Sequence, residues 1–314
     1  MPETLDANKV NTMAQGIDVL EDYLLTLDRE LLEILLFDRT TRRNILWATK
    51  DYEEYGADYA EFEEITPAAI TGAHSKLIQP RTAKAQNTQS GRTRSKAEVF
   101  TPSWMCNKQN NLVDEQWFGR AGVFNFEAEA SWVTNHETVN FTGAKGGWQK
   151  YIDAKRMELS CGEAPYIVSR YDTVTGQRIP LSDRVGILDR KLRVVNENAE
   201  SDDDWLKWSW RAVESVYGFE YQGDNLLLAR ENILYSYIEY YYARFKRQPE
   251  LTWLRKIAQT ISWNIWQMDG LKGVVPDSCK PLEHSQVTLF DDEAESTACP
   301  GCAKGDIFRH TGIY

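Results

Sequence analysis

Hydrophobic residues recur at steps of three and four positions near the start of the chain. They are Ile17, Leu20, Leu24, Leu27, Leu31, Leu35 and Leu36. This spacing places them on one face of a helix, so we predict helical structure over about residues 10–51. Within that range we expect a second helix to begin near Thr40 or Thr41, because a hydroxyl side chain is favourable just before the first turn of a helix.

Short apolar runs alternate with stretches of helical character between residues 151 and 271. The runs typical of strand ends are Met157–Leu159, Arg184–Leu188 and Ser215–Glu220, and the helical stretches are 226–245 and 251–263. Strands that alternate with helices are typical of an α/β sheet. We therefore predict that this part of the chain forms an α/β core.

The segments on either side of this core have a different composition. Residues 75–97 are basic and rich in Gln, Thr and Ser, and the residues from 276 onward are loop-like with an acidic run. Such compositions favour loops and connectors. We predict a helical N-terminal region with a basic connector over 1–95, an α/β domain over 96–275 and a tail containing Cys and His over 276–314.

The chain is acidic overall, with a formal net charge of −11. This charge is unfavourable for binding nucleic acid over the whole surface, because phosphate contacts depend on positive potential. The basic segment over 75–97 is a local exception to this acidic charge. A basic patch can bind nucleic acid at one face of an acidic protein. An alternative is that the segment is a solvated loop. The candidate DNA contacts are Arg81, Lys84, Arg92, Arg94 and Lys96.

Several features favour a soluble cytoplasmic protein. The longest apolar run is too short to cross a bilayer, and the N-terminus has neither the basic nor the apolar region of a secretory signal. The five cysteines are scattered and odd in number. This pattern argues against a framework of disulfides and for a reducing compartment.

Three short signals occur in an order that indicates a nucleotide-like ligand. They are Phe100-Thr101-Pro102, the segment Glu158–Ile167, and Tyr217-Gly218-Phe219-Glu220. An acidic residue at a strand end, followed by a turn of small residues, lets such a ligand approach the backbone. An acidic residue at the end of the next strand can bind ribose hydroxyls. Taken singly, the second signal also fits a plain loop and the third a solvated strand end.

Together, residues 96–269 resemble the amino-group adenine DNA methyltransferases of type I modification subunits and fused restriction–modification enzymes. Ala97–Pro102 is similar to the family's "(G)EVFTP" element, which precedes the sheet and closes over S-adenosylmethionine (AdoMet). Glu158–Ile167 is similar to its motif "D-P-x-C-G-x-G-x-F-L", and Glu220 to its ribose-binding acid. Asn264–Leu271 is similar to "N-I-x-x-x-D-x-L", whose acid lies near the adenine of AdoMet. The chain is also similar to proteins described as restriction endonuclease subunit M.

The resemblance implies a Rossmann-type, AdoMet-dependent methyltransferase-like sheet in the domain over 96–275. It implies AdoMet as cofactor, DNA as a partner, and a restriction or specificity subunit as a second partner. The implied reaction is methylation of the exocyclic amino group of adenine in DNA. The implied AdoMet-binding residues are Phe100, Thr101, Pro102, Glu158, Cys161, Gly162, Glu163, Ala164, Glu220 and Asp269.

The chain departs from the family pattern in ways that bear on catalysis. Glu158 stands where the family has Asp, Ala164 replaces the second glycine of the turn, and a long insertion spans 169–212. The catalytic tetrapeptide "(D/N/S)-P-P-(Y/F/W)" should follow Asp269, and Val275–Cys279 does not supply it. Catalytic residues therefore stay unassigned. The alternative is a non-catalytic protein that keeps the fold to bind DNA or a partner; a small-molecule methyltransferase would not explain the "EVFTP" element.

A pair of cysteines near the end of the chain is typical of half a zinc knuckle. Cys299-Pro300-Gly301-Cys302 has the CxxC spacing of such sites. Cys279 and His284 complete a structural zinc set with this pair, and His310 can replace either of them. The alternatives are a redox pair or two cysteines without a common role.

Overall fold

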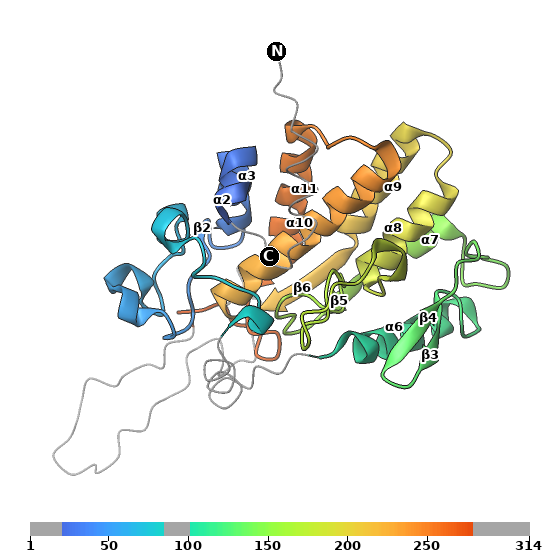
Figure 1. Cartoon of the computed structure of the whole chain (residues 1–314), viewed down its shortest axis with the longest axis horizontal. Coiled ribbons are helices and arrows are strands. Elements are labelled where there is room, and N and C mark those ends of the chain that lie inside the picture. The colour runs from blue at the N-terminus through green and yellow to red at the C-terminus, as the bar shows by residue number, and fades with distance from the viewer. Residues whose placement is uncertain (1–20, 85–100, 279–314) are drawn as a thin grey trace, which may run out of the picture.

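The computed structural model describes residues 21–84 and 101–278. This part of the chain is a mixed α/β structure with small sheets (Figure 1). The helices α8 (Ile187–Asn198), α9 (Asp202–Glu214), α10 (Gly223–Phe245) and α11 (Leu251–Asn264) lie above the strands in Figure 1. Helix α6 (Ser103–Phe118) and the hairpin of β3 (Asn125–Ala128) and β4 (Ser131–Thr134) lie below them. The largest sheet among the described residues has three strands, so the α/β character expected for 96–275 is confirmed and the Rossmann-type sheet stays a prediction.

The first described range forms small elements that surround the central sheet. Its helices and strands are α2 (Glu21–Leu27), α3 (Arg29–Leu36), β1 (Phe37–Asp38), β2 (Arg43–Asn44) and α4 (Pro67–Ile70), with short 3-10 helices at 53–55, 57–59, 72–74 and 81–83. Helix α3 exposes charged residues on one side and buries its leucines on the other. The predicted helical character of the N-terminal region is therefore confirmed over 21–36.

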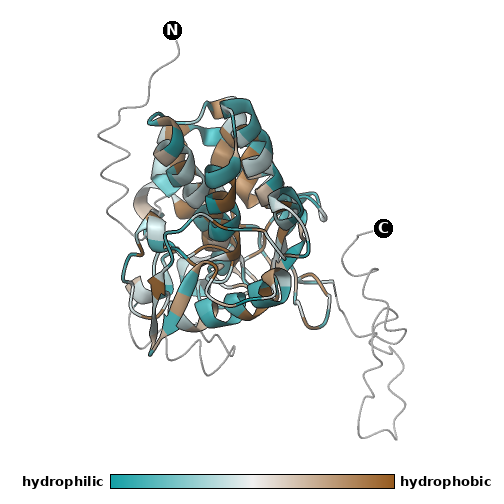
Figure 2. Cartoon of the chain, turned by 90° about the vertical axis from the view of Figure 1, so that its right-hand side faces the viewer, coloured by the Kyte–Doolittle hydropathy of each residue, from teal (hydrophilic) through white to brown (hydrophobic). Residues whose placement is uncertain are grey.

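The second described range contains the larger elements. They are α6 (Ser103–Phe118), β3 (Asn125–Ala128), β4 (Ser131–Thr134), α7 (Trp148–Asp153), β5 (Arg156–Glu158), α8 (Ile187–Asn198), α9 (Asp202–Glu214), β6 (Val216–Glu220), α10 (Gly223–Phe245), α11 (Leu251–Asn264) and β7 (Ile265–Gln267), with a 3-10 turn at Leu181–Asp183. Figure 2 shows hydrophobic and hydrophilic positions alternating along these helices. Their hydrophobic positions face the core, as α9 illustrates by burying Trp205 while its first turn is acidic.

The central sheet is parallel and has the order β5-β6-β7. Helices α8 and α9 connect β5 to β6, and α10 and α11 connect β6 to β7. The segment 169–212, which the sequence presents as an insertion, therefore holds most of the first crossover. Because the strands are parallel, their carboxyl ends meet at one edge of the sheet.

Glycine at position 218 allows close packing against the middle of β6. A Cβ atom there would lie 3.1 Å from the Cys161 Sγ atom and 3.3 Å from the Ile167 Cδ1 atom. Both neighbours belong to the segment that follows β5. The chain after β5 therefore folds back tightly onto β6, which fixes its position at the edge of the sheet.

Two predicted elements are wrong. The helix expected to begin near Thr40 or Thr41 is replaced by a hairpin of β1 and β2, in which the Asp38 carboxylate accepts hydrogen bonds from the backbone N–H and the hydroxyl of Thr40. The strand expected over Arg184–Leu188 is not formed, because α8 begins at Ile187. Ile187 and Leu188 belong to the first turn of this helix, and the Asp189 carboxylate caps that turn by accepting the backbone N–H of Gly186.

The buried Arg230 side chain joins three parts of the fold. From α10 its Nε and Nη2 atoms donate to the Ile265 carbonyl at 3.0 and 2.7 Å, and its Nη1 atom donates to the Leu35 carbonyl at 2.5 Å. Burial lowers the pKa of Arg230 to about 10, so the guanidinium keeps its charge at neutral pH. This side chain links α10 to β7 and to the N-terminal helices.

None of the helices in the part of the chain that the structure describes is both long and apolar enough to cross a membrane.

We expect Arg230→Met to lower the free energy of unfolding by about 3 kcal/mol, because it leaves buried carbonyl groups without a donor. Urea denaturation followed by circular dichroism measures this change. The control is Arg244→Met on the same helix, where a partly exposed side chain forms a 4.0 Å ion pair with Asp202. That variant should lose less than about 1 kcal/mol. Equal losses in the two variants would contradict the role of Arg230.

Candidate ligand-binding site

The carboxyl ends of the three parallel strands bring acidic and amide side chains together. Glu158 ends β5, Glu220 ends β6 and Gln267 ends β7. Glu158 pairs in register with Gly218, and Glu220 pairs with Gln267. The sequence expectation that Glu158 and Glu220 lie at neighbouring strand ends is confirmed.

The turn after β5 has an unusual backbone. Ser160, Gly162 and Ala164 have φ angles of 54, 53 and 64°. This left-handed region suits glycine but costs free energy for serine and alanine. The turn is held in place because the Cys161 backbone N–H donates to the Phe219 carbonyl at 2.7 Å. Strain of this kind is common where a backbone is shaped for a ligand.

Glu220 holds this turn against the sheet. Its Oε2 atom accepts the backbone N–H of Gly162 at 2.8 Å, and its Oε1 atom accepts that of Gln222 at 3.0 Å. The structure thus brings Gly162 and Glu220, both expected at a cofactor site, into direct contact. In this arrangement the Glu220 carboxylate positions the turn after β5.

Glu163 and Ala164, two other residues expected at the cofactor site, are buried. The Glu163 Oε1 atom accepts the backbone N–H of Arg81 at 2.6 Å, and its Oε2 atom accepts the Tyr171 hydroxyl at 2.6 Å. Glu163 therefore connects the turn to the N-terminal region. These bonds give it a structural role in the fold.

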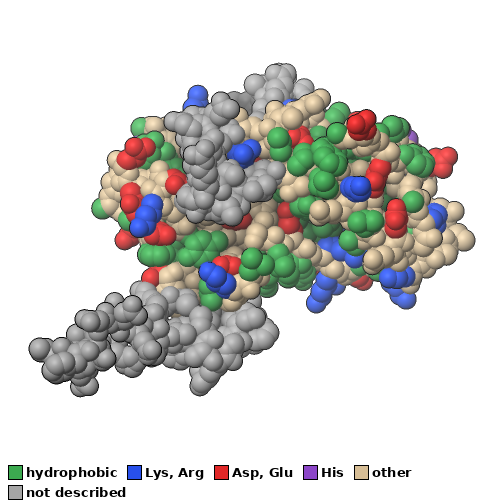
Figure 3. Space-filling view, turned by 90° about the horizontal axis from the view of Figure 1, so that it is seen from below, with side chains coloured by type: hydrophobic (Ala, Val, Ile, Leu, Met, Phe, Trp, Pro, Cys, Tyr) green, Lys and Arg blue, Asp and Glu red, His purple; other side chains and the backbone are tan. Residues whose placement is uncertain are grey.

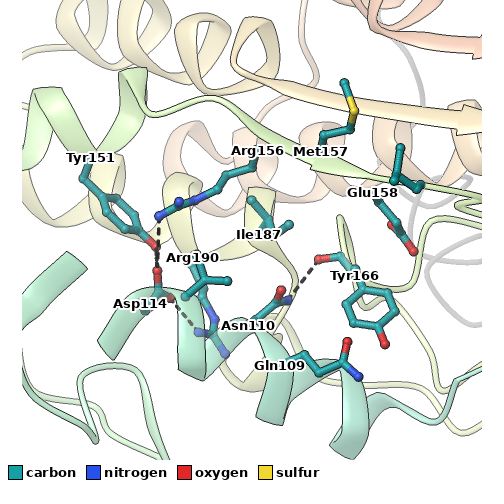
Figure 4. A pocket seen from close by; sticks show the side chains of 12 residues that line it. Gln109, Asn110, Asp114, Tyr151, Arg156, Met157, Glu158, Tyr166, Ile187 and Arg190 are labelled. Atoms are coloured by element: carbon teal, nitrogen blue, oxygen red, sulfur yellow. Dashed lines mark hydrogen bonds and ion pairs between the residues drawn. The ribbon is translucent and has the colours of Figure 1, made fainter. Parts of the chain in front are cut away.

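A cavity of about 430 Å³ lies along β5, between this strand and α6 (Figure 4). This volume is within the range of small-molecule sites, about 300–1,000 Å³. Val113, Met157 and Leu159 are exposed hydrophobic residues that line it. Figure 3, which shows the molecule from below, has hydrophobic side chains interspersed with charged ones across that face. The cavity thus combines apolar walls with polar groups.

Glu158 lies at one end of this cavity, next to Tyr166 (Figure 4). Glu158 is only 9% exposed, and its Oε2 atom has no hydrogen-bond partner among the described residues. Burial raises the pKa of Glu158 well above its ordinary value, and the charge of Glu220 raises it further. The backbone N–H groups of Tyr166 and Ile167 act in the opposite direction. A buried carboxyl oxygen without a partner is costly, which marks Glu158 as a group that a ligand can satisfy.

The described part of the Phe100-Thr101-Pro102 element lies at the same end of the cavity. Pro102 immediately precedes α6, and the Thr101 carbonyl accepts the Thr173 hydroxyl at 3.1 Å. Burial raises the pKa of Tyr166, whose phenol also interacts with the side chains of Thr101 and Cys106. Tyr166 lines the cavity and thus connects Thr101 to it, whereas Thr101 and Pro102 are themselves absent from the cavity lining. Phe100 lies outside the described residues.

The other end of the cavity contains a polar network that the sequence did not reveal. The Asp114 Oδ2 atom lies 2.6 Å from Arg190 Nη1, and its Oδ1 atom accepts the Tyr151 hydroxyl at 3.0 Å. The Nη2 atom of Arg156 is 3.9 Å from the same Oδ1 atom and makes no hydrogen bond within the described residues (Figure 4). Asp114 comes from an Asn-rich helix, where no motif distinguishes it.

Asp269 follows β7 and organises its own turn. Its Oδ1 atom accepts the backbone N–H groups of Leu271 and Lys272, each at 3.0 Å. The next residue, Gly270, approaches the turn after β5, since a Cβ atom on it would lie 3.4 Å from the Ser160 backbone nitrogen. The loop that carries Asp269 therefore contacts the strained turn, while Asp269 is absent from the walls of the cavity.

The two described basic residues among the expected DNA contacts lie inside the fold. The Lys84 ammonium is 3.0 Å from the buried Asp224 carboxylate, which also accepts the Tyr52 hydroxyl at 2.8 Å. Arg81 is half-buried and binds Glu163 through its backbone. These contacts give Lys84 a structural partner in the protein. The other expected DNA contacts, Arg92, Arg94 and Lys96, lie outside the described residues.

The expected zinc ligands also lie outside the described residues. They are Cys279, His284, Cys299 and Cys302, with His310 as the substitute. Within residues 21–84 and 101–278 there is no group of three or more His, Cys, Asp or Glu side chains placed to hold a metal ion. Zinc binding by the tail stays a prediction.

The chain matches no protein-family model, no curated protein and no solved structure.

We expect Glu158→Gln to change how stability depends on pH. A carboxyl group whose pKa is raised in the folded state stabilises the fold below its unfolded pKa, and this contribution is lost as pH rises through the folded pKa. The variant should therefore match the wild type near about pH 4 and be more stable than it near about pH 8. Denaturant unfolding at the two pH values measures the difference.

The control for this prediction is Glu33→Gln, on the exposed side of α3. It removes only an exposed ion pair with Arg29, worth less than about 1 kcal/mol, so its effect on stability should be small at both pH values. If the effect of Glu158→Gln were also the same at both, the account of Glu158 as a buried carboxyl group with a raised pKa would be wrong.

Proposed function

We propose that this protein binds AdoMet in the cavity beside β5 and is a DNA methyltransferase-like protein of a restriction–modification system. The proposal rests mainly on the environment of the Glu158 Oε2 atom. It is buried, lacks a partner among the described residues, and belongs to a side chain that lines a cavity at the carboxyl end of a parallel strand.

The sheet topology supports a nucleotide-like ligand at this place. Three parallel strands in the order β5-β6-β7, joined by helices, have the βαβαβ connectivity of a mononucleotide-binding half. In open α/β sheets, ligands bind outside the carboxyl ends of the strands. Glu158, Gly162 and Glu220 all lie at that edge. The finer assignment of a Rossmann-type methyltransferase sheet is part of this proposal.

The charges at this edge favour a ligand with hydroxyl groups and positive charge. The charge of Glu220 disfavours the ionised state of Glu158. Ribose hydroxyls can donate hydrogen bonds to such carboxylates, and a cation relieves the repulsion between them. AdoMet has both features, because it contains a ribose and a sulfonium. AdoMet would supply the methyl group, and the residues of this chain would bind and orient it.

The polar network at the far end of the cavity offers a place for a second part of the ligand. The Arg156 Nη2 atom lacks a hydrogen bond within the described residues and lies beside Asp114. A guanidinium in this state can donate to a carboxylate. The amino-acid part of AdoMet carries such a carboxylate, so the cavity provides complementary groups at both ends.

A second candidate function is binding without methyl transfer. The segment Val275–Ser278 stands where the resemblance places the catalytic tetrapeptide, and its residues do not match it. A protein of this kind would use the same cavity for AdoMet and would engage DNA or a partner subunit without modifying the base. The two candidates share the binding step and differ in the transfer of the methyl group.

We expect the wild-type protein to bind AdoMet in isothermal titration calorimetry, and Glu158→Ala to bind it at least about tenfold more weakly, a loss of about 1.4 kcal/mol. The matched control is Glu33→Ala, which removes a carboxylate from the exposed side of α3 and should bind like the wild type. The proposal fails if the wild type does not bind AdoMet, or if Glu158→Ala binds it equally well.

A methyl-incorporation assay with DNA separates the two candidates. Transfer of a labelled methyl group to adenine by the wild type, and its reduction in Glu158→Ala, selects the methyltransferase. AdoMet binding without incorporation selects the binding protein.

A further inference from the structure

A second cavity, separate from the one beside β5, lies between α10 and the segment that precedes α8. Its volume is about 320 Å³, and it is lined by Arg178, Ile179, Pro180, Leu181, Arg184 and Glu239. None of these residues lines the first cavity. The walls therefore combine an apolar segment with charged side chains from two elements.

Three guanidinium groups surround one carboxylate at this cavity. Arg184 Nη2 lies 2.6 Å from Glu239 Oε2, Arg170 Nε lies 3.4 Å from the same atom, and Arg178 Nη2 lies 3.4 Å from Glu239 Oε1. A single glutamate does not neutralise three arginines. This local excess of positive charge stands out in a chain with a formal net charge of −11.

The other acidic group near Arg184 is Asp189, at the start of α8. Its Oδ2 atom accepts the backbone N–H groups of Ser169 and Gly186, and burial raises its pKa. Attraction to Arg184 opposes this effect of burial on the pKa of Asp189. Asp189 and Glu239 together are two carboxyl groups beside three guanidinium groups. The positive excess at the cavity is therefore only partly compensated from within the fold.

The arginines also have unused hydrogen-bonding capacity. The Arg184 side chain is 2% exposed, and its Nη1 atom is buried without a partner among the described residues. The Arg178 side chain is 35% exposed, so it can reach a ligand that enters from solvent. Burial lowers the pKa of Arg178, attraction to Glu239 opposes this change, and repulsion from Arg170 and Arg184 lowers the pKa further. An anion in the cavity would relieve this repulsion and satisfy the donor of Arg184.

We infer that this cavity is a binding site for a phosphate group. Planar guanidinium groups donate paired hydrogen bonds to phosphate oxygens, and a tetrahedral anion can meet donors from more than one arginine. Glu239 orients the arginines, and the apolar segment Ile179–Leu181 excludes water from one side of the site. The site does not depend on AdoMet binding beside β5.

The first test uses inorganic phosphate with the full chain in calorimetry. We expect the wild type to bind phosphate and Arg178→Gln to bind it at least about tenfold more weakly, because one of the donors is removed. Arg178 is partly exposed, so this variant should keep the unfolding midpoint of the wild type. The control Arg29→Gln removes an exposed arginine of α3 and should leave phosphate binding unchanged. Absence of phosphate binding by the wild type, or equal binding by Arg178→Gln, would overturn the inference.

A second arm distinguishes the sources of the phosphate. Binding of a fluorescent DNA duplex is measured by anisotropy for the same three proteins. If Arg178→Gln binds the duplex more weakly than the wild type and Arg29→Gln does not, the ligand is a phosphate of the nucleic-acid backbone. Equal duplex binding by all three, together with the loss of inorganic phosphate binding in Arg178→Gln, indicates a small phosphate ester. Both results support the phosphate site and select its ligand.

Discussion

The parallel pairing of β5 with β6 is the constraint on which the candidate site depends. It places Glu158 and Glu220 at one edge of the sheet, and it lets the Glu220 carboxylate bind the backbone N–H of Gly162. That bond, together with the close approach of Cys161 to Gly218, holds the left-handed turn after β5 against the sheet. Without this pairing, the acidic side chains and the strained turn would not share a common edge.

The same arrangement leaves an oxygen of the Glu158 carboxyl group without a hydrogen bond from the described residues. Glu220 places its two oxygens on backbone donors, whereas Glu158 is buried with an oxygen that lacks a partner among the described residues. Burial and the neighbouring acid both raise the pKa of Glu158. The fold tolerates this cost because Arg230 and other buried side chains tie α10, β7 and the N-terminal helices together. A ligand that satisfies Glu158 would recover part of that cost.

The sequence predicts those parts of the site that depend on local order. Strand β6 and its terminal acid follow from an apolar run, and the turn after β5 follows from its small residues. The start of α8 was mistaken for a strand, since its apolar residues are compatible with both structures and the cap by Asp189 becomes visible only in three dimensions. The Asp114–Arg190 pair could not be foreseen, because these residues are 76 positions apart and carry no motif. The buried pairing of Lys84 with Asp224 was hidden for the same reason.

We propose that Glu158 is a buried carboxyl group that a cationic, ribose-containing ligand satisfies. The most direct measurement is a pH titration of the glutamate side-chain carboxyl carbons by NMR, with Glu158→Gln to assign the signal, in the absence and presence of AdoMet. We expect a raised pKa for Glu158 in the free protein and a lower one when AdoMet is bound. An ordinary pKa in the free protein, or a titration that AdoMet leaves unchanged, would contradict the account.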